Sequence, residues 1–373
     1  MRALATIRVI DSISPIENAD AIEVAAIGGW NVVVKKGDFK VGDLVVYFEI
    51  DSWIPTELAP FLSKGKEPRE FEGVKGERLR TIKLRGQISQ GLILPVQDCI
   101  TFAESFLPEN EQGCSDYNIQ EGDDFTDSLN VKKYEKPVNA QLAGIARGNF
   151  PSFIPKTDQE RIQNLKRDLN DWSENELEFE VSEKVDGTSA TFYRYDRLAE
   201  DGKEIYGVCS RNLDLKETEG NTYWQVARSG ILDVLEKAGR TLAIQGEIAG
   251  PGIQSNQYQL PNVMFFVFDI FDISTQQYLT SEERQAFCKQ YGLTHVPVFA
   301  NIALFKEADE TSKLFNETTT VENILNRAIG ESKLNALYGS GQSTREGLVF
   351  KCLSDPSISF KAISNKWLLK YEE

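Results

Sequence analysis

The chain has 373 residues, of which 41% are hydrophobic and 26% charged, an ordinary globular composition that is long enough for two domains. Its net charge of −16 argues against a nucleic-acid partner unless basic residues gather locally, and no run of about 20 apolar residues could cross a membrane. The first ten residues do not form a signal peptide, so we expect a cytoplasmic protein with reduced cysteines. The single histidine, His295, excludes Ser-His-Asp and multi-histidine metal chemistry, which leaves lysine, arginine and carboxylates to do any catalysis.

The first hundred residues are typical of short strands separated by Gly, Asp and Lys-Gly turns. Little helical periodicity interrupts them, so the segment predicts a small closed β-barrel, with the OB-fold as the leading candidate. A barrel with a structural or protein-binding role is an equally open alternative. The expected strands cover residues 3–13, 21–30, 31–37, 43–50, 78–86 and 90–96.

Charge is unevenly distributed along this first part of the chain. Residues 61–85 contain eight Lys or Arg against four Glu, whereas residues 104–127 contain eight acidic side chains and no basic one. Because phosphate contacts are local, the basic segment can bind nucleic acid despite the net negative charge. The acidic stretch predicts a solvated connector. We therefore expect an OB-fold domain with its connector at 1–128 and a second domain at 129–373.

The second domain alternates expected strands and helices, which predicts an α+β domain of antiparallel sheets with flanking helices. A capping-box pattern from Thr157 to Glu160 predicts a helix that continues to about Trp172. Further helices are expected at 221–238, 281–291 and 320–336. The expected strands are 177–184, 188–195, 205–210, 241–248, 263–270, 346–351 and 357–363.

Lys184 ends one of these strands, and Asp186 and Gly187 follow it directly. A Lys-x-Asp-Gly string alone is weak evidence, because about one chain of this size in ten contains it by chance and Asp-Gly also serves ordinary turns. Here, however, further polar and aromatic residues follow in order, each on or just beyond a strand, so that all could line one cleft between sheets. They are Arg211, Glu247, Phe268, Glu346, Lys351 and Lys361.

This ordered set resembles the covalent nucleotidyltransferase superfamily of ATP-dependent DNA ligases, RNA ligases and mRNA capping enzymes, over roughly residues 178–366. The strings IPKTDQERIQN and QGEIAGPGIQSNQY resemble RNA ligase 2-type enzymes. With a barrel before this domain, the chain is most similar to the Naegleria-type (family five) RNA ligases, which carry an N-terminal OB domain. The resemblance implies a nucleotidyltransferase domain of the ATP-grasp-like ligase kind. Only twelve residues follow Lys361, so we expect no OB domain after the catalytic one.

A lysine attacks the α-phosphate of ATP only as a neutral amine, and free lysine has a pKa near 10.4. Neighbouring cations and a bound metal favour the neutral amine, so we expect Lys351 and Lys361 to supply positive charge around Lys184 and to hold phosphates. Three carboxylates supply hard oxygen ligands that suit Mg²⁺, or Mn²⁺ in its place. These expected metal ligands are Asp186, Glu247 and Glu346.

The resemblance implies individual roles for the other residues. Lys184 would carry AMP, Glu183 would lie beside the adenine edge, and Arg211 would contact ribose or phosphate. Phe268 would stack on the base, although Phe268 and Phe266 are equally well explained as core residues. Glu247, Lys351 and Lys361 would also bind the nucleotide. Arg345 stays open between a surface pair and the cleft, and the sequence departs from many ligases at Ser359, where they carry lysine.

The resemblance predicts an ATP-dependent RNA ligase that joins 3′-hydroxyl and 5′-phosphate ends through a lysine–AMP and an AMP-capped 5′ end. Its partners would be RNA with nicked or broken ends, or RNA–DNA hybrids, and the protein would act as a monomer. Three alternatives remain: a DNA ligase, a capping guanylyltransferase, and a catalytically inactive RNA-binding homologue.

Overall fold

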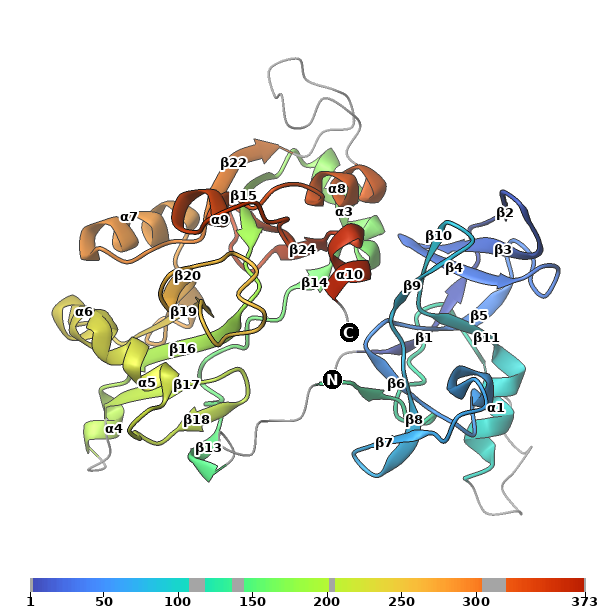
Figure 1. Ribbon diagram of the computed structural model, residues 1–373, viewed down its shortest axis with the longest axis horizontal. Helices are drawn as coiled ribbons and strands as arrows, with labels where there is room; N and C mark the ends of the chain where they lie inside the picture. Colours follow the sequence, from blue (N-terminus) through green and yellow to red (C-terminus); the bar gives the residue numbers. More distant parts are fainter. Residues whose placement is uncertain (1–2, 107–117, 136–143, 201–204, 304–319, 372–373) are drawn as a thin grey trace. The chain divides into compact units, whose positions relative to one another are not determined.

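The computed structural model describes residues 3–106, 118–135, 144–200, 205–303 and 320–371. The chain divides into two compact units, one of residues 1–137 with 368–373 and the other of residues 138–367 (Figure 1). Within the described residues, no helix has both the length and the apolar character needed to span a membrane. The four cysteines in this part of the chain are buried free thiols, as the sequence predicts.

The described part of the first unit contains four small antiparallel sheets. One has the order β1-β5-β11, the second β2-β3-β4, the third pairs β9 with β10, and the fourth has the order β12-β6-β8-β7. The strands are β1 (Ala5–Val9), β2 (Ser12–Ile16), β3 (Ala19–Ile27), β4 (Trp30–Lys35), β5 (Leu44–Phe48), β6 (Ser52–Pro55), β7 (Arg69–Phe71), β8 (Val74–Arg78), β9 (Thr81–Leu84), β10 (Gln87–Gln90), β11 (Leu92–Pro95) and β12 (Lys132–Lys133). A 3₁₀ turn, η1 (Pro60–Ser63), and the helix α1 (Val96–Glu104) complete the unit.

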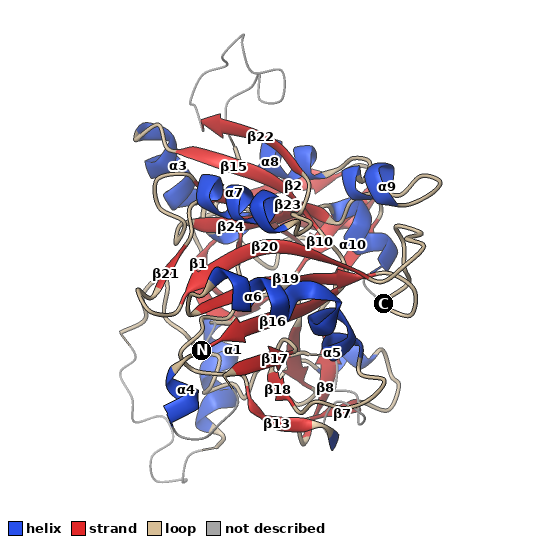
Figure 2. Ribbon diagram, turned by 90° about the vertical axis from the view of Figure 1, so that its left-hand side faces the viewer, coloured by secondary structure: helices blue, strands red, loops and turns tan. Residues whose placement is uncertain are grey.

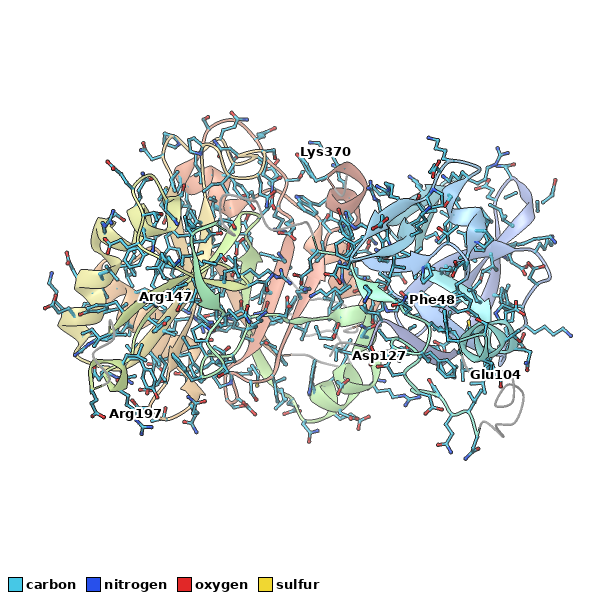
Figure 3. All side chains as sticks on the ribbon, turned by 90° about the horizontal axis from the view of Figure 1, so that it is seen from below. Phe48, Glu104, Asp127, Arg147, Arg197 and Lys370 are labelled. Carbon is cyan, nitrogen blue, oxygen red and sulfur yellow. The ribbon has the colours of Figure 1, made fainter. Side chains whose placement is uncertain are left out.

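Strand β5 separates two hydrophobic cores, because successive side chains of a strand point to opposite faces. Val46 and Phe48 face one core, whereas Val45 and Tyr47 face the other. Figure 3 marks Phe48, which is fully buried. Burial on both faces explains why the strand is an uninterrupted apolar run rather than an alternating one.

The acidic stretch is not a solvated connector where the structure describes it. Phe125 N donates to Ala5 O at 2.7 Å, and the Thr126 hydroxyl accepts from the backbone N–H groups of Leu4 at 2.8 Å and Ala5 at 3.1 Å. Leu129 and Val131 are buried in the same core as β1. Residues 118–135 therefore belong to the first unit, because their backbone and apolar side chains complete it, while residues 107–117 lie outside the described residues.

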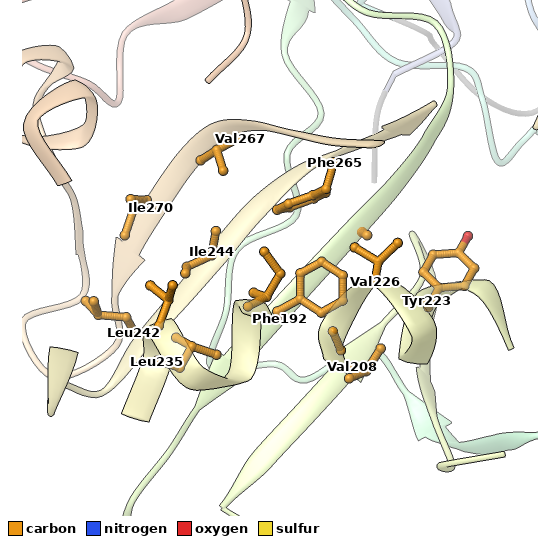
Figure 4. Packing of buried hydrophobic residues seen from close by; sticks show 14 of the residues in the cluster. Phe192, Val208, Tyr223, Val226, Leu235, Leu242, Ile244, Phe265, Val267 and Ile270 are labelled. Carbon is orange, nitrogen blue, oxygen red and sulfur yellow. The ribbon is translucent and has the colours of Figure 1, made fainter. Parts of the chain in front are cut away.

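The second unit contains a seven-stranded antiparallel sheet with the order β13-β18-β17-β16-β19-β20-β21. Figure 2 shows β16, β19 and β20 side by side. Helices α5 (Thr222–Val226), α6 (Leu232–Ala238) and α7 (Ser281–Tyr291) contribute to the hydrophobic core that covers one face. Phe192, Ile244 and Val267 pack together in this core (Figure 4). The strands are β13 (Ala146–Asn149), β16 (Thr188–Arg194), β17 (Tyr206–Cys209), β18 (Leu213–Leu215), β19 (Leu242–Ala249), β20 (Met264–Asp272) and β21 (Gln277–Tyr278).

A five-stranded sheet has the order β14-β24-β23-β15-β22, with only β14 parallel to its neighbour among the described strands. One of its faces packs against helices α3 and α8. Its strands are β14 (Glu160–Arg161), β15 (Glu178–Lys184), β22 (Val298–Ala303), β23 (Gly347–Cys352) and β24 (Ser359–Ile363). The helices of the unit are η2 (Ile162–Asn164), α3 (Lys166–Glu174), α4 (Arg197–Glu200), α5 (Thr222–Val226), η3 (Ala227–Ile231), α6 (Leu232–Ala238), α7 (Ser281–Tyr291), α8 (Val321–Ala328), α9 (Lys333–Tyr338) and α10 (Asn365–Tyr371), the last of which extends past the division between the units.

The expected strands are present, and the helix predicted at 281–291 matches α7 at both ends. The capping box predicted at Thr157 is wrong, because Glu160 and Arg161 pair with β24 as strand β14. The Glu160 side chain accepts from Arg161 N and from the Asn164 side chain, and the helix begins only at Lys166. Strand pairing with β24 took precedence over local capping. The helix expected at 320–336 is interrupted between α8 and α9, where Ser332 starts a new cap.

Candidate active site

Strand alternation gathers the predicted lysines on one face of the five-stranded sheet. Along β15, Phe179 and Val181 enter the core, so Glu180, Ser182 and Lys184 point to the opposite face. Lys351 lies opposite Glu180, and Lys361 lies opposite Val349, which itself lies opposite Ser182. Lys184, Lys351 and Lys361 therefore share that face.

Lys184 is the last residue of β15, and the chain then passes through residues 185–187 into β16 of the other sheet. A Cβ at Gly187 would fall 2.3 Å from Ile248 O, which no real Cβ tolerates. Across the strand pair, Gly347 lies opposite Lys184, and a Cβ there would fall 2.2 Å from Ala362 O. Glycine is needed at both positions because backbone approaches backbone closely around the lysine.

Carboxylates, rather than cations, surround Lys184. Its Nζ lies 2.8 Å from Glu346 Oε1, and the Lys184 side chain is 26% exposed. Burial lowers the pKa of Lys184, but the charges of Glu346, Glu247 and Asp186 and the hydrogen bond to Glu346 outweigh it, so the pKa is raised. Among the protein groups, the strand ends therefore place acids, and not the expected cations, closest to this amine, and the expected contribution of a bound metal stays a prediction.

Glu247 lies on β19, opposite Ser189 of β16. Burial raises its pKa to about 8; Lys184 and Arg211 oppose this, while Glu346 and Asp186 reinforce it. Three carboxylates thus interact electrostatically around one ammonium group, and their mutual repulsion is only partly compensated.

These carboxylates suit a divalent cation. The second oxygen of Glu346, Oε2, is buried and has no hydrogen-bond partner among the described residues. A buried, unsatisfied carboxylate oxygen is costly unless a cation or donor reaches it. No three His, Cys, Asp or Glu side chains within the described ranges are already gathered as a metal site, so Asp186 and Glu247 would join Glu346 by side-chain adjustment.

Glu183 points away from Lys184, as the residue before it on a strand must. Its Oε1 accepts from the Ser332 hydroxyl at 2.6 Å and its Oε2 from Leu334 N at 2.8 Å, so it caps the N-terminus of α9. Burial raises its pKa, against these hydrogen bonds and the charge of Arg345. Both oxygens are occupied by the protein, and contact with an adenine edge stays a prediction.

Lys351 forms an ion pair in the protein interior. Its Nζ lies 2.6 Å from Asp269 Oδ1 and donates to Phe268 O at 2.6 Å. A β-bulge at Phe268 makes this pair possible, since Gly246 pairs with Val267 but Gln245 pairs with Asp269. The extra residue turns Phe268 and Asp269 to the same side of β20. A role for Lys351 in holding phosphates stays a prediction.

The predicted stacking residue is half-buried, and its ring centre lies 5.6 Å from Lys351 Nζ. Phe266, by contrast, is fully buried in the same cluster as Phe268, which identifies it as the core residue of the two. Phe268 is thus better placed to stack on a base, and this role stays a prediction.

Two arginines occupy different positions. Arg211 is exposed, and its Nη2 lies 2.8 Å from Asp158 Oδ1. Its positive charge also acts to lower the pKa of Glu247. Arg345 donates to the carbonyls of Arg327, Ala328 and Ile329 at the end of α8, so it is a helix C-cap rather than a cleft residue.

Sequence reasoning missed Arg284 of α7, which is 1% exposed. It pairs with Glu180, lies 3.7 Å from Asp269 Oδ1, and donates from Nε to His295 Nε2 at 3.0 Å. Burial lowers the pKa of His295 to about 4, so the imidazole is neutral. Helical periodicity in the sequence could have predicted this burial, because Arg284 shares a helix face with Phe287 and Cys288, the face that enters the core.

Two parts of the chain match known protein families. A family model described as an OB-fold domain matches residues 4–96, and the RNA ligase family model matches residues 177–367. No curated protein sequence matches the chain.

Solved structures of Naegleria gruberi RNA ligase are similar over the whole chain. An apo mutant is 41% identical with a TM-score of 0.82, covering 100% of this chain and 99% of that one. A mutant with ATP and Mn is 41% identical with a TM-score of 0.81, covering 99% of each chain. A third structure, with PPi, is 42% identical with a TM-score of 0.80, covering 100% of this chain and 99% of that one. The fold is therefore shared with these enzymes over the full length, and the chain belongs to the RNA ligase family.

Proposed function

We propose that this protein is an ATP-dependent RNA ligase that seals 3′-hydroxyl and 5′-phosphate ends. In the first step, Lys184 Nζ forms a bond to the α-phosphorus of ATP, and the bond to pyrophosphate breaks. In the second, a 5′-phosphate oxygen takes AMP from the lysine, which regains its amine. In the third, the 3′-hydroxyl oxygen attacks the capped 5′-phosphate, loses its proton and expels AMP.

The position of Lys184 carries this proposal: a half-buried amine at a strand end, 2.8 Å from Glu346 Oε1. The amine must lose a proton before it attacks, and Glu346 Oε1 is the acceptor already hydrogen-bonded to it. Asp186, Glu247 and Glu346 would hold Mg²⁺ or Mn²⁺, whose charge when bound offsets the carboxylates and favours the neutral amine. Lys361 on the same sheet face and exposed Arg211 would contact the phosphates.

Protein labelling with α-labelled ATP tests the assignment. Lys184→Ala should abolish transfer of label to protein, whereas Lys289→Ala, which removes an exposed lysine from α7, should leave it unchanged. Label that persists on the Lys184→Ala protein would overturn the proposal. Labelling by α-labelled GTP instead of ATP would favour a capping guanylyltransferase, and absence of any adduct an inactive RNA-binding homologue.

The first unit would bind the strand that ends in the 3′-hydroxyl, through the basic segment 64–85. The hairpin β9–β10 exposes Lys83 and Arg85, which are available for phosphate contacts. Charge reversal of both residues should weaken binding of nicked RNA and reduce its salt dependence while sparing self-adenylylation. Lys36→Glu, an exposed change of the same kind outside the segment, is the control. Unchanged nick binding would refute this role.

We also propose that RNA–DNA hybrids are substrates and that the protein acts as a monomer in the cytoplasm. The sequence places the domain boundary at 128–129, whereas the compact units divide at 137–138. A preference for RNA over DNA needs contacts to the 2′-hydroxyl. Sealing of matched RNA, hybrid and DNA nicks by one preparation separates these substrates. Faster sealing of DNA would favour a DNA ligase.

A further inference from the structure

The loop of residues 250–260, here called the brace loop, contacts the turn that follows Lys184 in three places. Asp186 N donates to the Tyr258 hydroxyl at 2.7 Å, and Gln257 Nε2 donates to Asp186 Oδ2 at 3.3 Å. Gln254 Nε2 donates to Gly187 O at 3.0 Å. The backbone and the carboxylate of the turn are both held from this loop.

The brace loop is itself rigidly built. Gln254, Asn256 and Gln259 have φ between 44° and 50°, a conformation that non-glycine residues rarely adopt. Such conformations persist only where surrounding contacts determine them, and they gather at functional sites. Here the Asn256 side chain accepts from Leu260 N and donates to Leu260 O, both at 3.1 Å, which closes the loop on itself.

Helix α9 holds the brace loop from the other side. Asn335, which is 3% exposed, donates from Nδ2 to Tyr258 O at 2.6 Å. The N-terminus of α9 is in turn capped by Glu183, the neighbour of Lys184. Contacts therefore run in a circuit from Glu183 through α9 and Tyr258 back to Asp186. The circuit begins at Glu183, the residue before Lys184, and ends at Asp186, two residues after it.

We propose that Tyr258, supported by Asn335, is a positioning residue for the first chemical step. It acts through Asp186: by fixing the backbone N–H of this residue, it sets the carboxylate relative to Lys184 Nζ. The inference rests on the proposed function of Lys184 and deepens it. Misplacement of a reacting or supporting group by about 1 Å is enough to slow an enzyme substantially.

Tyr258→Phe removes only the hydroxyl and keeps the buried ring. In the full-length protein, formation of the labelled adduct from ATP and Mg²⁺ should slow by about 10-fold, and the Mg²⁺ concentration for half-maximal rate should rise. Amide hydrogen exchange of the peptide around Asp186 should accelerate without faster exchange in the core strands. In a Lys184→Ala background, Mg²⁺-dependent ATP binding measured by calorimetry should weaken as well. Tyr291→Phe, the same change at a half-buried residue of α7, is the matched control.

Asn335→Ala gives an independent test, because this side chain contacts Tyr258 rather than the turn. It should slow adduct formation in the same way. The double variant should be at most about twofold slower than Tyr258→Phe alone, because both substitutions act on one contact. Urea midpoints separate these effects from unfolding. A wild-type rate and Mg²⁺ dependence in Tyr258→Phe would overturn this proposal alone. A wild-type protein that forms no adduct would contradict the proposed function and this inference together.

Discussion

Removal of one acid from the buried charge network beside the site should destabilise the protein strongly. Asp269 lies 2.6 Å from Lys351 Nζ, and their side chains are 8% and 4% exposed. Glu180 and Arg284 complete the network, both with side chains 1% exposed. Its two acids and two bases balance, so Asp269→Asn leaves one positive charge uncompensated in the interior.

The magnitude follows from this burial. Loss of one partner of a buried ion pair costs about 3–5 kcal/mol, whereas removal of both partners is close to neutral. Asp269→Asn should therefore lower the free energy of unfolding at pH 7 by about 3–5 kcal/mol. Adding Lys351→Met should return most of that loss, since the remaining pair of Glu180 and Arg284 is balanced.

Urea unfolding of the wild type, both single variants and the double variant measures this as a double-mutant cycle. We expect the double variant to lose at least about 2 kcal/mol less than the sum of the single losses. Additive losses would refute the reasoning, because they would mean that Asp269 and Lys351 do not compensate one another.

The same pair predicts a pH dependence. Burial lowers the pKa of Lys351 from 10.5 to about 8, with Asp269 opposing and Arg284 reinforcing the change. Between pH 8 and 10.5 the unfolded chain binds the proton that the folded protein has lost, so stability rises with pH across this window. At about 1.4 kcal/mol per pKa unit, the wild type should gain about 3 kcal/mol relative to Lys351→Met. Parallel stability curves of the two proteins over this range would contradict the assignment.

Three further variants test the site directly. Glu183→Gln should lower the free energy of unfolding by about 1–3 kcal/mol, because a glutamine amide has one accepting oxygen and cannot accept from both the Ser332 hydroxyl and Leu334 N; urea midpoints measure the loss. Gly187→Ala should slow adduct formation by about 100-fold because its Cβ displaces the turn, whereas Gly148→Ala, which has open space around the Cβ, should react normally. Glu346→Gln should raise the Mg²⁺ concentration needed for adduct formation by about 10-fold, and an unchanged Mg²⁺ titration would exclude Glu346 as a ligand.

Apolar alternation and motif order in the sequence were enough to predict the strands that carry the site. Lys184, Glu247 and Glu346 each lie on or beside a strand end, where a period of two decides which face a side chain takes. The five-stranded and seven-stranded sheets are joined at the Lys184 turn, which brings these strand ends together. This part of the site was predictable because it depends on local periodicity.

Only the tertiary structure decided what each charge pairs with. Lys351 and Arg345 are both cations in the last motifs, yet one is buried against Asp269 and the other caps a helix. The bulge at Phe268 and the position of Arg284 on α7 determine the first of these pairs. Pairing of charges depends on distances between segments far apart in the chain, which local sequence patterns do not encode. For the same reason, the acids around Lys184 could be predicted as metal ligands, whereas their effect on its pKa could not.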